Sequence, residues 1–314
     1  MQHTIACWNI EWMNRMFTNG EVTEDNTGRA RAIATVIERL DADLIAISEG
    51  ANEPAEHEHF IDRFLGGGYT AVMGRSRGAQ NLVYYVRDSI DVVSVDDAFN
   101  AYGEWTADVD DDGLSERHRF ERRPLDLVVG IGGHRVRFIS VHTKSKGVYS
   151  IADLPRFELL SAANRAKLVG QGRRLRERLD SLIGEGEHVI VLGDMNDGPG
   201  LDFYERSLGT SFVESVIGSV FEPEGIFHDP LWWMTRTASD RRKLWTAAFD
   251  DPIVNNPLGW KHRVWLDHIL ASPSLLRPDS PIRLVEDSGA IDAKDTTSYR
   301  ASDHFAVTAV IDVG

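Results

Sequence analysis

The sequence predicts a single α/β domain over residues 1–314 with mixed β-sheets, and three observations support this fold class. Short apolar runs, which are typical of buried strands, recur along the whole chain. A few longer segments with apolar residues at helical spacing separate these runs. No internal repeat, low-complexity tract or linker-like stretch interrupts the chain. A length of 314 residues would allow two domains, but without a boundary we expect one.

In the first half of the chain, apolar and β-branched runs predict strands at residues 4–10, 43–47, 82–86, 90–95, 125–129 and 136–141. The polar residues 87–89 predict a hairpin between 82–86 and 90–95, and residues 130–134 predict another between the last two strands. Residues 29–40 have apolar side chains at helical spacing. Residues 55–65 also indicate a helix, which the glycines at 66–68 would end.

In the second half, the dominant feature is a long helix predicted at residues 154–183. Asp153 can cap its N-terminus, and Pro155 stands in the first turn, where a missing N–H group is tolerated. A buried strand at 189–192 follows and runs directly into polar residues. The last predicted strands are 264–270 and 306–311.

The amino-acid composition excludes several classes of protein. The net charge of −15 excludes a protein that coats nucleic acid by bulk positive charge, but it leaves room for a local basic groove. The single cysteine, Cys7, excludes a disulfide framework and a cysteine-based zinc cluster, and we expect it to be a small buried residue. No apolar run reaches about 18 residues, so no transmembrane helix is expected. The N-terminus does not resemble a signal peptide, and we expect a cytoplasmic protein without integral membrane contact.

Polar residues stand where the predicted strands begin or end, and this placement indicates a functional site. They are carboxylates, amides and histidines, which would converge if the strand ends gathered at one edge of the sheets. They comprise Asn9, Glu11, Glu49, His142, Asp194, Asn196, Asp267, Asp303 and His304. Asp194 and Asn196 are two residues apart, so an extended backbone would point both side chains to the same side.

These residue types suit the hydrolysis of a phosphate ester. The carboxylates Glu49, Asp303 and Glu11 are hard oxygen ligands, which favour Mg²⁺ or Mn²⁺ over Zn²⁺. Asparagine side chains donate to phosphate oxygens without adding negative charge. Histidines act near pH 7 as a general base, a general acid or a cationic clamp. Together these groups predict in-line attack of water on a phosphoester with the help of a metal ion.

Six motifs carry a resemblance to a known family. They are Trp8-Asn9-Ile10-Glu11, Ser48-Glu49-Gly50, Ser140-Val141-His142-Thr143-Lys144, Gly193-Asp194-Met195-Asn196-Asp197, Leu266-Asp267-His268-Ile269-Leu270 and Ser302-Asp303-His304. Each motif alone is weak, but the ordered set over residues 8–304 resembles the endonuclease/exonuclease/phosphatase superfamily, which has a deoxyribonuclease I-like fold. The resemblance implies a four-layer αββα sandwich, in which two mixed β-sheets lie face to face with helices outside.

The resemblance also implies a metal site. Glu49 would be the principal ligand of Mg²⁺ or Mn²⁺, with help from Asn9, Glu11 or Asp303. Asn9 would also contact the substrate.

Catalytic roles follow from the same resemblance. Asp194 and Asn196 would orient the attacking water and hold the scissile phosphate. His304, oriented by Asp267, would be the general base or a phosphate clamp. This pairing is physically reasonable because a carboxylate fixes the tautomer of an imidazole and raises its pKa. His142 would be a further catalytic residue.

Two features indicate which branch of the family this sequence resembles most. A histidine at position 142 resembles the deoxyribonuclease I, sphingomyelinase and phosphatase branches more than the abasic-site endonucleases. The segment Phe120-Glu121-Arg122-Arg123-Pro124 resembles a deoxyribonuclease I motif and makes Arg122 a candidate phosphate contact. In that branch a glutamate partners the histidine, but the aligned residue here is Gln80. A neutral partner would raise the pKa of His142 less.

Two further segments each permit two interpretations. Asp108 to Asp112 match the opening of a Ca²⁺-binding loop, but Arg119 replaces the glutamate expected at position twelve, so a solvated acidic loop is the alternative. Residues 228–268, the tryptophan-rich segment, contain five of the eight tryptophans among arginines and lysines. Such a segment suits base stacking beside a cleft, or it forms a packed subdomain with a solvated rim.

Three functions remain open at this point. The first is a Mg²⁺- or Mn²⁺-dependent phosphodiesterase that cleaves nucleic acid. The second is the same chemistry on a small phosphorylated metabolite or a phospholipid head group, which the negative net charge favours. The third is a non-catalytic binding protein on the same fold. The first two imply a phosphate-ester substrate, and nothing in the sequence implies an obligate protein partner.

Overall fold

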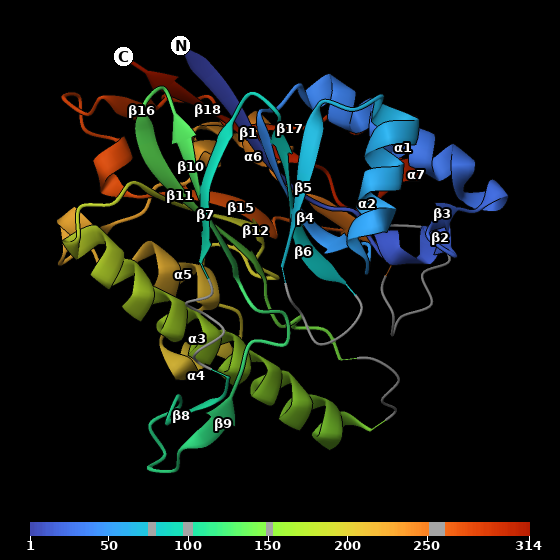
Figure 1. Cartoon of the computed structure of the whole chain (residues 1–314). Coiled ribbons are helices and arrows are strands. Elements are labelled where there is room, and N and C mark those ends of the chain that lie inside the picture. Colours follow the sequence, from blue (N-terminus) through green and yellow to red (C-terminus); the bar gives the residue numbers. More distant parts are fainter. Residues whose placement is uncertain (75–79, 97–102, 149–152, 251–260) are drawn as a thin grey trace.

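Two β-sheets pack face to face, and helices cover the outer face of each sheet, which gives four layers (Figure 1). The computed structural model describes residues 1–74, 80–96, 103–148, 153–250 and 261–314. The αββα sandwich expected from the sequence is confirmed. The division of residues 1–314 into a single domain stays a prediction.

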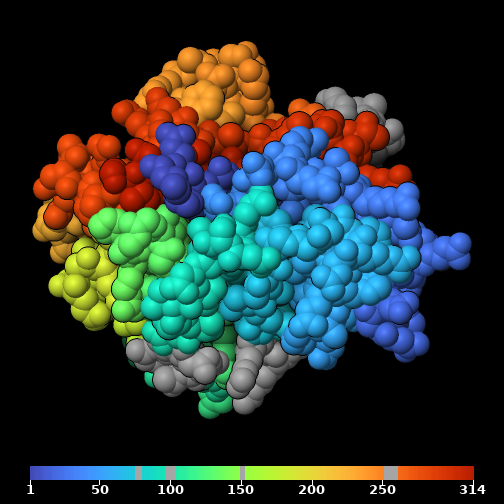
Figure 2. Space-filling view, turned by 45° about the horizontal axis from the view of Figure 1, so that its top comes forward, coloured from blue at the N-terminus to red at the C-terminus, as the bar shows by residue number. Residues whose placement is uncertain are grey.

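The first sheet has β1 and β4 near its centre. In spatial order its strands are β16 (Ile282–Leu284), β18 (Val307–Val313), β1 (Gln2–Asn9), β4 (Leu44–Gly50), β6 (Asn81–Arg87) and β5 (Tyr69–Met73), with β17 (Ala290–Ile291) beside β18. β1 and β4 are parallel, whereas the other pairs are antiparallel. The first and last strands of the chain are therefore neighbours, and Figure 2 shows the dark blue N-terminal residues beside red C-terminal ones.

The second sheet is also mixed. In spatial order its strands are β15 (Asp267–Ala271), β12 (Val189–Asp194), β11 (His134–His142), β10 (Leu125–Ile131) and β7 (Asp91–Asp96). β11 and β12 are parallel, and the remaining neighbours are antiparallel. The hairpin predicted around residues 130–134 is confirmed as β10 and β11.

Apolar side chains fill the spaces between the layers. Successive side chains of a strand point to opposite faces, so Ile5 and Cys7 face the second sheet while Ala6 and Trp8 face the helices. Phe138 packs against the inner cluster from the second sheet. Cys7 is buried, as predicted.

Helices form the two outer layers (Figure 1). α1 (Thr27–Leu40), α2 (Pro54–Phe60) and α7 (Thr296–Ala301) cover the first sheet, and α3 (Leu154–Gly184) and α5 (Phe212–Ile217) cover the second. A π-helical turn, Ile61–Leu65, continues α2 and completes the helix predicted at 55–65. Asp153 caps α3 by accepting the N–H of Arg156, as expected.

The smaller elements are α4 (Glu205–Leu208), α6 (Ala238–Arg241) and the 3₁₀ turns Met13–Met16, Glu24–Asn26, Pro223–Gly225, Pro230–Thr235 and Pro273–Leu275. Short hairpins join β2 (Phe17–Thr18) to β3 (Glu21–Val22) and β8 (Trp105–Ala107) to β9 (Glu116–His118). In the described part of the chain, no helix is both long enough and apolar enough to cross a membrane.

The hairpin predicted over residues 82–95 is wrong. β6 pairs with β4 and β5 in the first sheet, whereas β7 pairs with β10 in the second. Both edges of β6 are already occupied, so the turn at residues 87–89 carries the chain from one sheet to the other.

The single strand predicted at residues 264–270 is also wrong, because the chain breaks in its middle. β14 (His262–Val264) pairs with β13 (Ala247–Phe249), and β15 begins at Asp267. At the break, the hydroxyl of Thr246 accepts the N–H groups of Leu266 and Asp267 at 3.0 Å each. This break places Asp267 at the start of a strand, where its side chain enters the candidate site.

Candidate active site

Strand ends from both sheets meet at one edge of the sandwich, and residues predicted from the sequence stand there. Asn9 ends β1, and Glu49 lies at the end of β4. In the second sheet, His142, Asp194 and Asp267 lie in register across β11, β12 and β15. The parallel pairing of β11 with β12 brings two of these side chains to the same edge.

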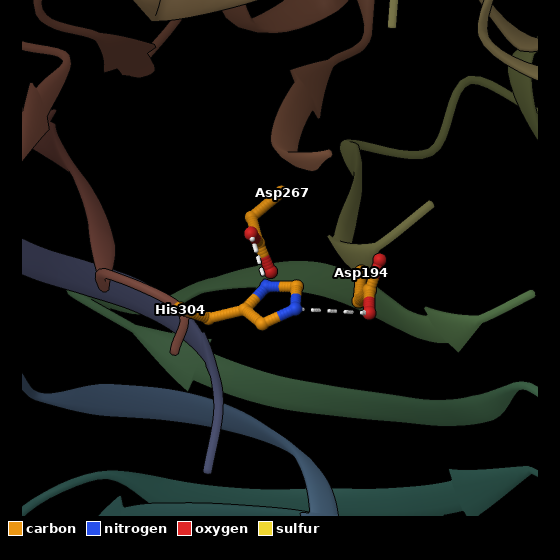
Figure 3. Close-up of side chains that lie close together, drawn as sticks. All are labelled: Asp194, Asp267 and His304. Carbon is orange, nitrogen blue, oxygen red and sulfur yellow. Dashed lines mark hydrogen bonds and ion pairs between the residues drawn. The ribbon is translucent and has the colours of Figure 1, made fainter. Parts of the chain in front are cut away.

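A histidine between two aspartates forms the buried floor of the site (Figure 3). Nδ1 of His304 lies 2.8 Å from Oδ2 of Asp267, and Nε2 lies 3.9 Å from Oδ2 of Asp194. Burial alone lowers the pKa of His304, but the two carboxylates outweigh burial and raise this pKa to about 10. The ring therefore carries a proton on each nitrogen, and Nδ1–H donates to Asp267. The structure thus brings together the pair that the sequence predicts.

Asp194 links the two sheets through its side chain. Its Oδ2 accepts a hydrogen bond from Nδ2 of Asn9 at 2.9 Å, and its Oδ1 accepts the backbone N–H of Asn196 at 2.8 Å. Burial raises the pKa of the Asp194 carboxyl to about 6. Gly193 precedes it because a Cβ atom at that position would lie 2.2 Å from the carbonyl oxygen of Val141. The close pairing of β12 with β11 therefore requires glycine there.

Three donors fix the carboxylate of Glu49. Nδ2 of Asn9 lies 3.3 Å from Oε1, so this one amide group contacts both Glu49 and Asp194. The backbone N–H of Trp12 and Nε2 of Gln80 donate to Oε2 at 2.9 and 2.6 Å. Glu49 has a φ of +58°, which is strained for a residue other than glycine. These contacts orient its carboxylate toward Asp194.

Gln80 connects Glu49 to Arg122. The guanidinium group of Arg122 donates to Oε1 of Gln80 at 2.5 Å. Burial lowers the pKa of Arg122, and the charge of Glu49 opposes this shift. From the sequence, Gln80 is expected only as an altered partner for His142. In the structure it contacts both Glu49 and Arg122, and so it joins three segments that are far apart along the chain. Arg122, the predicted phosphate contact, therefore lies inside the candidate site.

His142 stands beside both carboxylates. Its Nε2 lies 3.5 Å from Oδ2 of Asp194 and 3.9 Å from Oε1 of Glu49. Its Nδ1 is buried and has no hydrogen-bond partner among the described residues. The amide of Gln80 donates to Glu49 instead. Burial lowers the pKa of His142 well below its ordinary value, and the nearby Arg122 acts in the same direction. The ring is therefore neutral.

The expectation that an extended backbone aligns Asp194 with Asn196 is wrong. β12 ends at Asp194, and Asn196 adopts a left-handed conformation with a φ of +47°. The backbone N–H of Asn196 turns back to Asp194, and its Nδ2 donates to the carbonyl oxygen of Thr143 at 3.3 Å. This turn still leaves Asn196 at the site, next to the end of β11.

Glu11 and Asp303 lie at the rim of the site, close to each other. Burial and the charge of Asp303 raise the pKa of Glu11, whereas Arg29 lowers it. Arg29 also donates to the carbonyl oxygens of Ile10, at 2.7 Å, and of Glu11. Asp303 Oδ1 lies 4.0 Å from Nε2 of His304. A role for Glu11 and Asp303 as metal ligands stays a prediction.

The donor set around Glu49 fits a hard divalent cation. Carboxylate and amide oxygens are the ligands that Mg²⁺ and Mn²⁺ prefer. One oxygen of Glu49 and one of Asp194 both lie within 3.9 Å of Nε2 of His142, so the two carboxylates border the same space. Oδ1 of Asp267 is buried and has no hydrogen-bond partner within the described ranges. The residues present therefore suit the metal that the sequence predicts.

The acidic loop predicted as a Ca²⁺ site lies away from these residues, between β8 and β9. Asp108, Asp110 and Asp112 each have a carboxylate oxygen within 4.8 Å of the others. Two of these side chains already accept backbone hydrogen bonds, from the N–H groups of Gly113 and Leu114. Strands and not helices flank the loop, and Ca²⁺ binding there stays a prediction.

The tryptophan-rich segment packs mostly into the protein. Trp233 and Trp265 donate their indole N–H groups to backbone carbonyls, and Trp245 is buried. Trp232 is exposed, and Trp260 lies outside the described residues. These contacts favour the packed subdomain over a surface for base stacking.

Residues 6–304 match the sequence profile of the Endonuclease/Exonuclease/phosphatase family. The chain belongs to this family. The resemblance indicated by the six motifs is therefore confirmed. Members of this endonuclease/exonuclease/phosphatase family are phosphoester hydrolases, and membership supports the same class of reaction for the residues at the strand edge.

One curated human protein is similar to this chain over part of its length. Human DNA-(apurinic or apyrimidinic site) endonuclease 2 is 23% identical over 237 residues, which cover 69% of this chain and 44% of that protein. The chain thus spans less than half the length of the curated relative it matches.

Solved structures of low sequence identity show the same fold. Truncated TDP2 from Caenorhabditis elegans has a TM-score of 0.57 at 16% identity, with 99% of this chain and 97% of that chain covered. An AP endonuclease from Archaeoglobus fulgidus has a TM-score of 0.57 at 19% identity, with 99% and 100% covered. TDP2 of D. rerio, complexed with a single strand DNA product, has a TM-score of 0.56 at 16% identity, with 99% of each chain covered.

Proposed function

We propose that this chain is a Mg²⁺- or Mn²⁺-dependent phosphodiesterase that cleaves a nucleic acid strand. One observation carries the proposal. A single amide group, Nδ2 of Asn9, contacts both Glu49 and Asp194, while His304 lies between Asp194 and Asp267. With Glu49 as a metal ligand, Asp194 as a base and protonated His304 as a cation, these groups would supply what in-line hydrolysis of a phosphoester requires.

Glu49 would hold the metal ion, with Glu11 and Asp303 as further predicted ligands. Asn9 would ligate the ion only through its oxygen Oδ1, which accepts the N–H of Glu11 at 2.9 Å, because its Nδ2 donates to Glu49 and Asp194. When bound, the ion would supply Lewis-acid polarisation of a phosphoryl oxygen. The hydrogen bonds that Trp12 and Gln80 donate to Glu49 orient this carboxylate, as outer contacts commonly do for metal ligands.

Asp194 serves as the general base in this proposal. It accepts the proton of the attacking water while the new P–O bond forms and the ester P–O bond breaks, and the released alcohol takes its proton from bulk water. Two donors, Asn9 and Asn196, already hold its carboxylate in one orientation. His142 is neutral beside it and orients the water as a hydrogen-bond partner.

His304 is the phosphate clamp and not the base. Its Nδ1–H donates to Asp267, and its Nε2 also carries a proton, so the ring can donate to a phosphoryl oxygen but cannot accept a proton from water. The charge that develops on phosphate in the transition state would strengthen this hydrogen bond.

A group of cations beside the site supports a polyanionic substrate. Burial lowers the pKa of Lys144, Glu121 opposes the shift, and the positive charges of Lys167, Arg122 and Arg165 add to the effect of burial. Three other cations therefore lie near Lys144. Two similar proteins support a nucleic acid substrate, since the human relative is named for abasic sites in DNA and the D. rerio TDP2 structure is complexed with a single strand DNA product.

A second candidate is a phosphatase or phosphodiesterase for a small phosphorylated metabolite or a phospholipid head group. The net charge of −15 favours it, because a negatively charged protein attracts a long polyanion only weakly. The cations around Lys144 favour the nucleic acid. The two candidate functions are distinguished by which substrates the protein hydrolyses.

The test presents single-stranded and duplex oligonucleotides, a small phosphodiester, a phosphomonoester and a phospholipid to the full chain. We expect oligonucleotide cleavage with Mg²⁺ or Mn²⁺, none with EDTA, and a fall of about 100-fold or more in kcat for Asp194→Asn. Asp312→Asn, at the far end of β18, is the matched control and should cleave normally. Cleavage that survives EDTA or Asp194→Asn contradicts the proposal. Intact oligonucleotides with turnover of a small ester favour the second candidate, and no turnover of any substrate favours a non-catalytic binding protein.

A further inference from the structure

We propose that Trp12, backed by Arg15, is a stacking platform for the nucleobase that adjoins the scissile phosphate. The inference rests on the proposed function. It identifies Trp12 as a residue that would favour substrates carrying nucleobases. No motif in the sequence draws attention to Trp12, and its place beside the candidate metal ligand comes from the structure alone.

The backbone of Trp12 is fixed at the site. Its N–H donates to Oε2 of Glu49 at 2.9 Å. Covalent geometry then keeps every atom of the indole within about 10 Å of that carboxylate oxygen. A base attached to the nucleotide at the scissile phosphate lies at a comparable distance from the metal-type ligands. The ring is therefore within reach of a flanking base.

The side chain of Trp12 lies on the outer face of a short helical turn. In a 3₁₀ turn, residues three apart share a face, and here Met13 and Met16 point inward and are fully buried. Trp12 and Arg15 share the opposite face, where Trp12 is partly exposed and Arg15 is exposed. In the described residues, Trp12 belongs to none of the hydrophobic clusters, although both methionines pack into one of them. Packing of the core therefore does not explain a tryptophan at this position.

The chain adopts a strained conformation at this turn. Glu11 and Trp12 have φ values of +40° and +54°, and two consecutive left-handed residues without glycine are costly. Arg29 stabilises the turn by donating to the carbonyl oxygen of Glu11, and Glu49 does so by accepting the N–H of Trp12. The fold thus holds a large aromatic ring at the rim of the site without burying it.

The chemistry of the pair suits a nucleobase. The guanidinium carbon of Arg15 lies 3.8 Å from the centroid of the indole of Trp12, so a cation covers one face of the ring. Aromatic rings in proteins that bind single strands stack on bases of any sequence, and an adjacent arginine adds attraction for the backbone phosphates. A sugar phosphate or a phospholipid head group offers no flat ring for such a contact. The platform therefore predicts a nucleobase as the neighbour of the scissile phosphate.

The experiment compares two single-stranded polymers of equal length and charge, one carrying thymine bases and one made of abasic tetrahydrofuran residues. The readout is the ratio of kcat/KM for the two polymers with Mg²⁺ or Mn²⁺. We expect the wild-type chain to prefer the polymer with bases by roughly 5- to 150-fold, which corresponds to one stacked base. Trp12→Gly should bring the ratio close to one, since glycine accepts the left-handed backbone but has no ring. Trp12→Phe should retain part of the preference.

The matched control is Trp232→Ala, which removes another exposed tryptophan outside the site and should keep the wild-type ratio. Thermal unfolding of each variant identifies any loss of folded protein. Equal hydrolysis of both polymers by the wild-type chain overturns the platform while leaving the proposed function intact, and so does a preference that persists in Trp12→Gly. Failure of the wild-type chain to hydrolyse either polymer, with turnover of a small ester, overturns both.

Discussion

Replacement of Gln80 by alanine tests whether Gln80 positions Arg122, the proposed phosphate contact, relative to Glu49, the proposed metal ligand. Gln80 is buried, its Nε2 lies 2.6 Å from Glu49, and its Oε1 lies 2.5 Å from Arg122. A hydrogen bond to a charged group contributes about 1.5–3 kcal/mol. Loss of one such contact from the transition state would lower kcat/KM by roughly 10- to 150-fold. The assay is steady-state cleavage of a single-stranded oligonucleotide at saturating metal.

A double-mutant cycle separates positioning from a general loss of structure. Gln80→Ala, Arg122→Ala and the double variant are compared by their changes in transition-state free energy. If Gln80 acts by holding Arg122, the double variant should lose less than the sum of the single variants, with a coupling of about 1 kcal/mol or more. Additive effects within about 0.5 kcal/mol would refute this reasoning.

The backbone at Gln80 gives this comparison a useful control. Its φ is +72°, and alanine is strained there to the same degree as glutamine, so the change removes hydrogen bonds without relieving strain. Gln2→Ala, on an exposed glutamine of β1, should leave cleavage unchanged. A lowered affinity for Mg²⁺ in Gln80→Ala would indicate that the contact to Glu49 also matters.

Three further predictions concern single buried groups. Asp267→Asn removes the carboxylate that holds His304, the proposed phosphate clamp, so kcat for the oligonucleotide should fall roughly 10- to 150-fold, and an unchanged kcat would contradict this role. Burial lowers the pKa of His57 to about 4, and its unfolded pKa is near 6.5; the unfolded chain therefore binds the proton first as the pH falls, and stability should drop by about 3 kcal/mol between pH 6.5 and 4. Urea unfolding should show this slope reduced in His57→Gln, and an equal slope would refute the assignment. Lys146→Met leaves the buried carboxylates of Asp197 and Glu205 without their cation, and should lower the free energy of unfolding by about 3–5 kcal/mol in urea unfolding; adding Glu205→Gln should recover part of this loss, and no recovery would contradict the pairing.

The layers and most of the site residues could be predicted because both depend on local patterns. A strand buried on both faces is a continuous apolar run, as at Val189–Asp194, and a polar residue at its end has no place in the core. Residues such as Asp194 and His142 therefore stand out, and the order of the six motifs adds the family. The pairing of Asp267 with His304 could be expected because a carboxylate partner is a common requirement of a functional histidine.

Long-range pairing could not be predicted from the same patterns. β6 and β7 satisfy every local sign of a hairpin, yet they belong to different sheets because β5 and β4 already flank β6. The contact from Gln80 to Arg122 has the same origin. The two side chains meet only because the two sheets pack together. Neither a glutamine nor an arginine in the sequence predicts which residue it will contact.

The orientation of the side chains in the site depends on backbone conformations that the sequence pattern does not predict. Several of the described non-glycine residues with positive φ lie in the site, namely Glu11, Trp12, Glu49, Gln80 and Asn196. Each such conformation costs about 1–2 kcal/mol relative to an ordinary one. The hydrogen bonds that offset this cost come from other members of the set, since Glu49 accepts from Trp12 and Gln80, and Asp194 accepts from Asn196. Loss of one side chain should therefore loosen its neighbours as well, and effects of substitutions within this group should be coupled more often than additive.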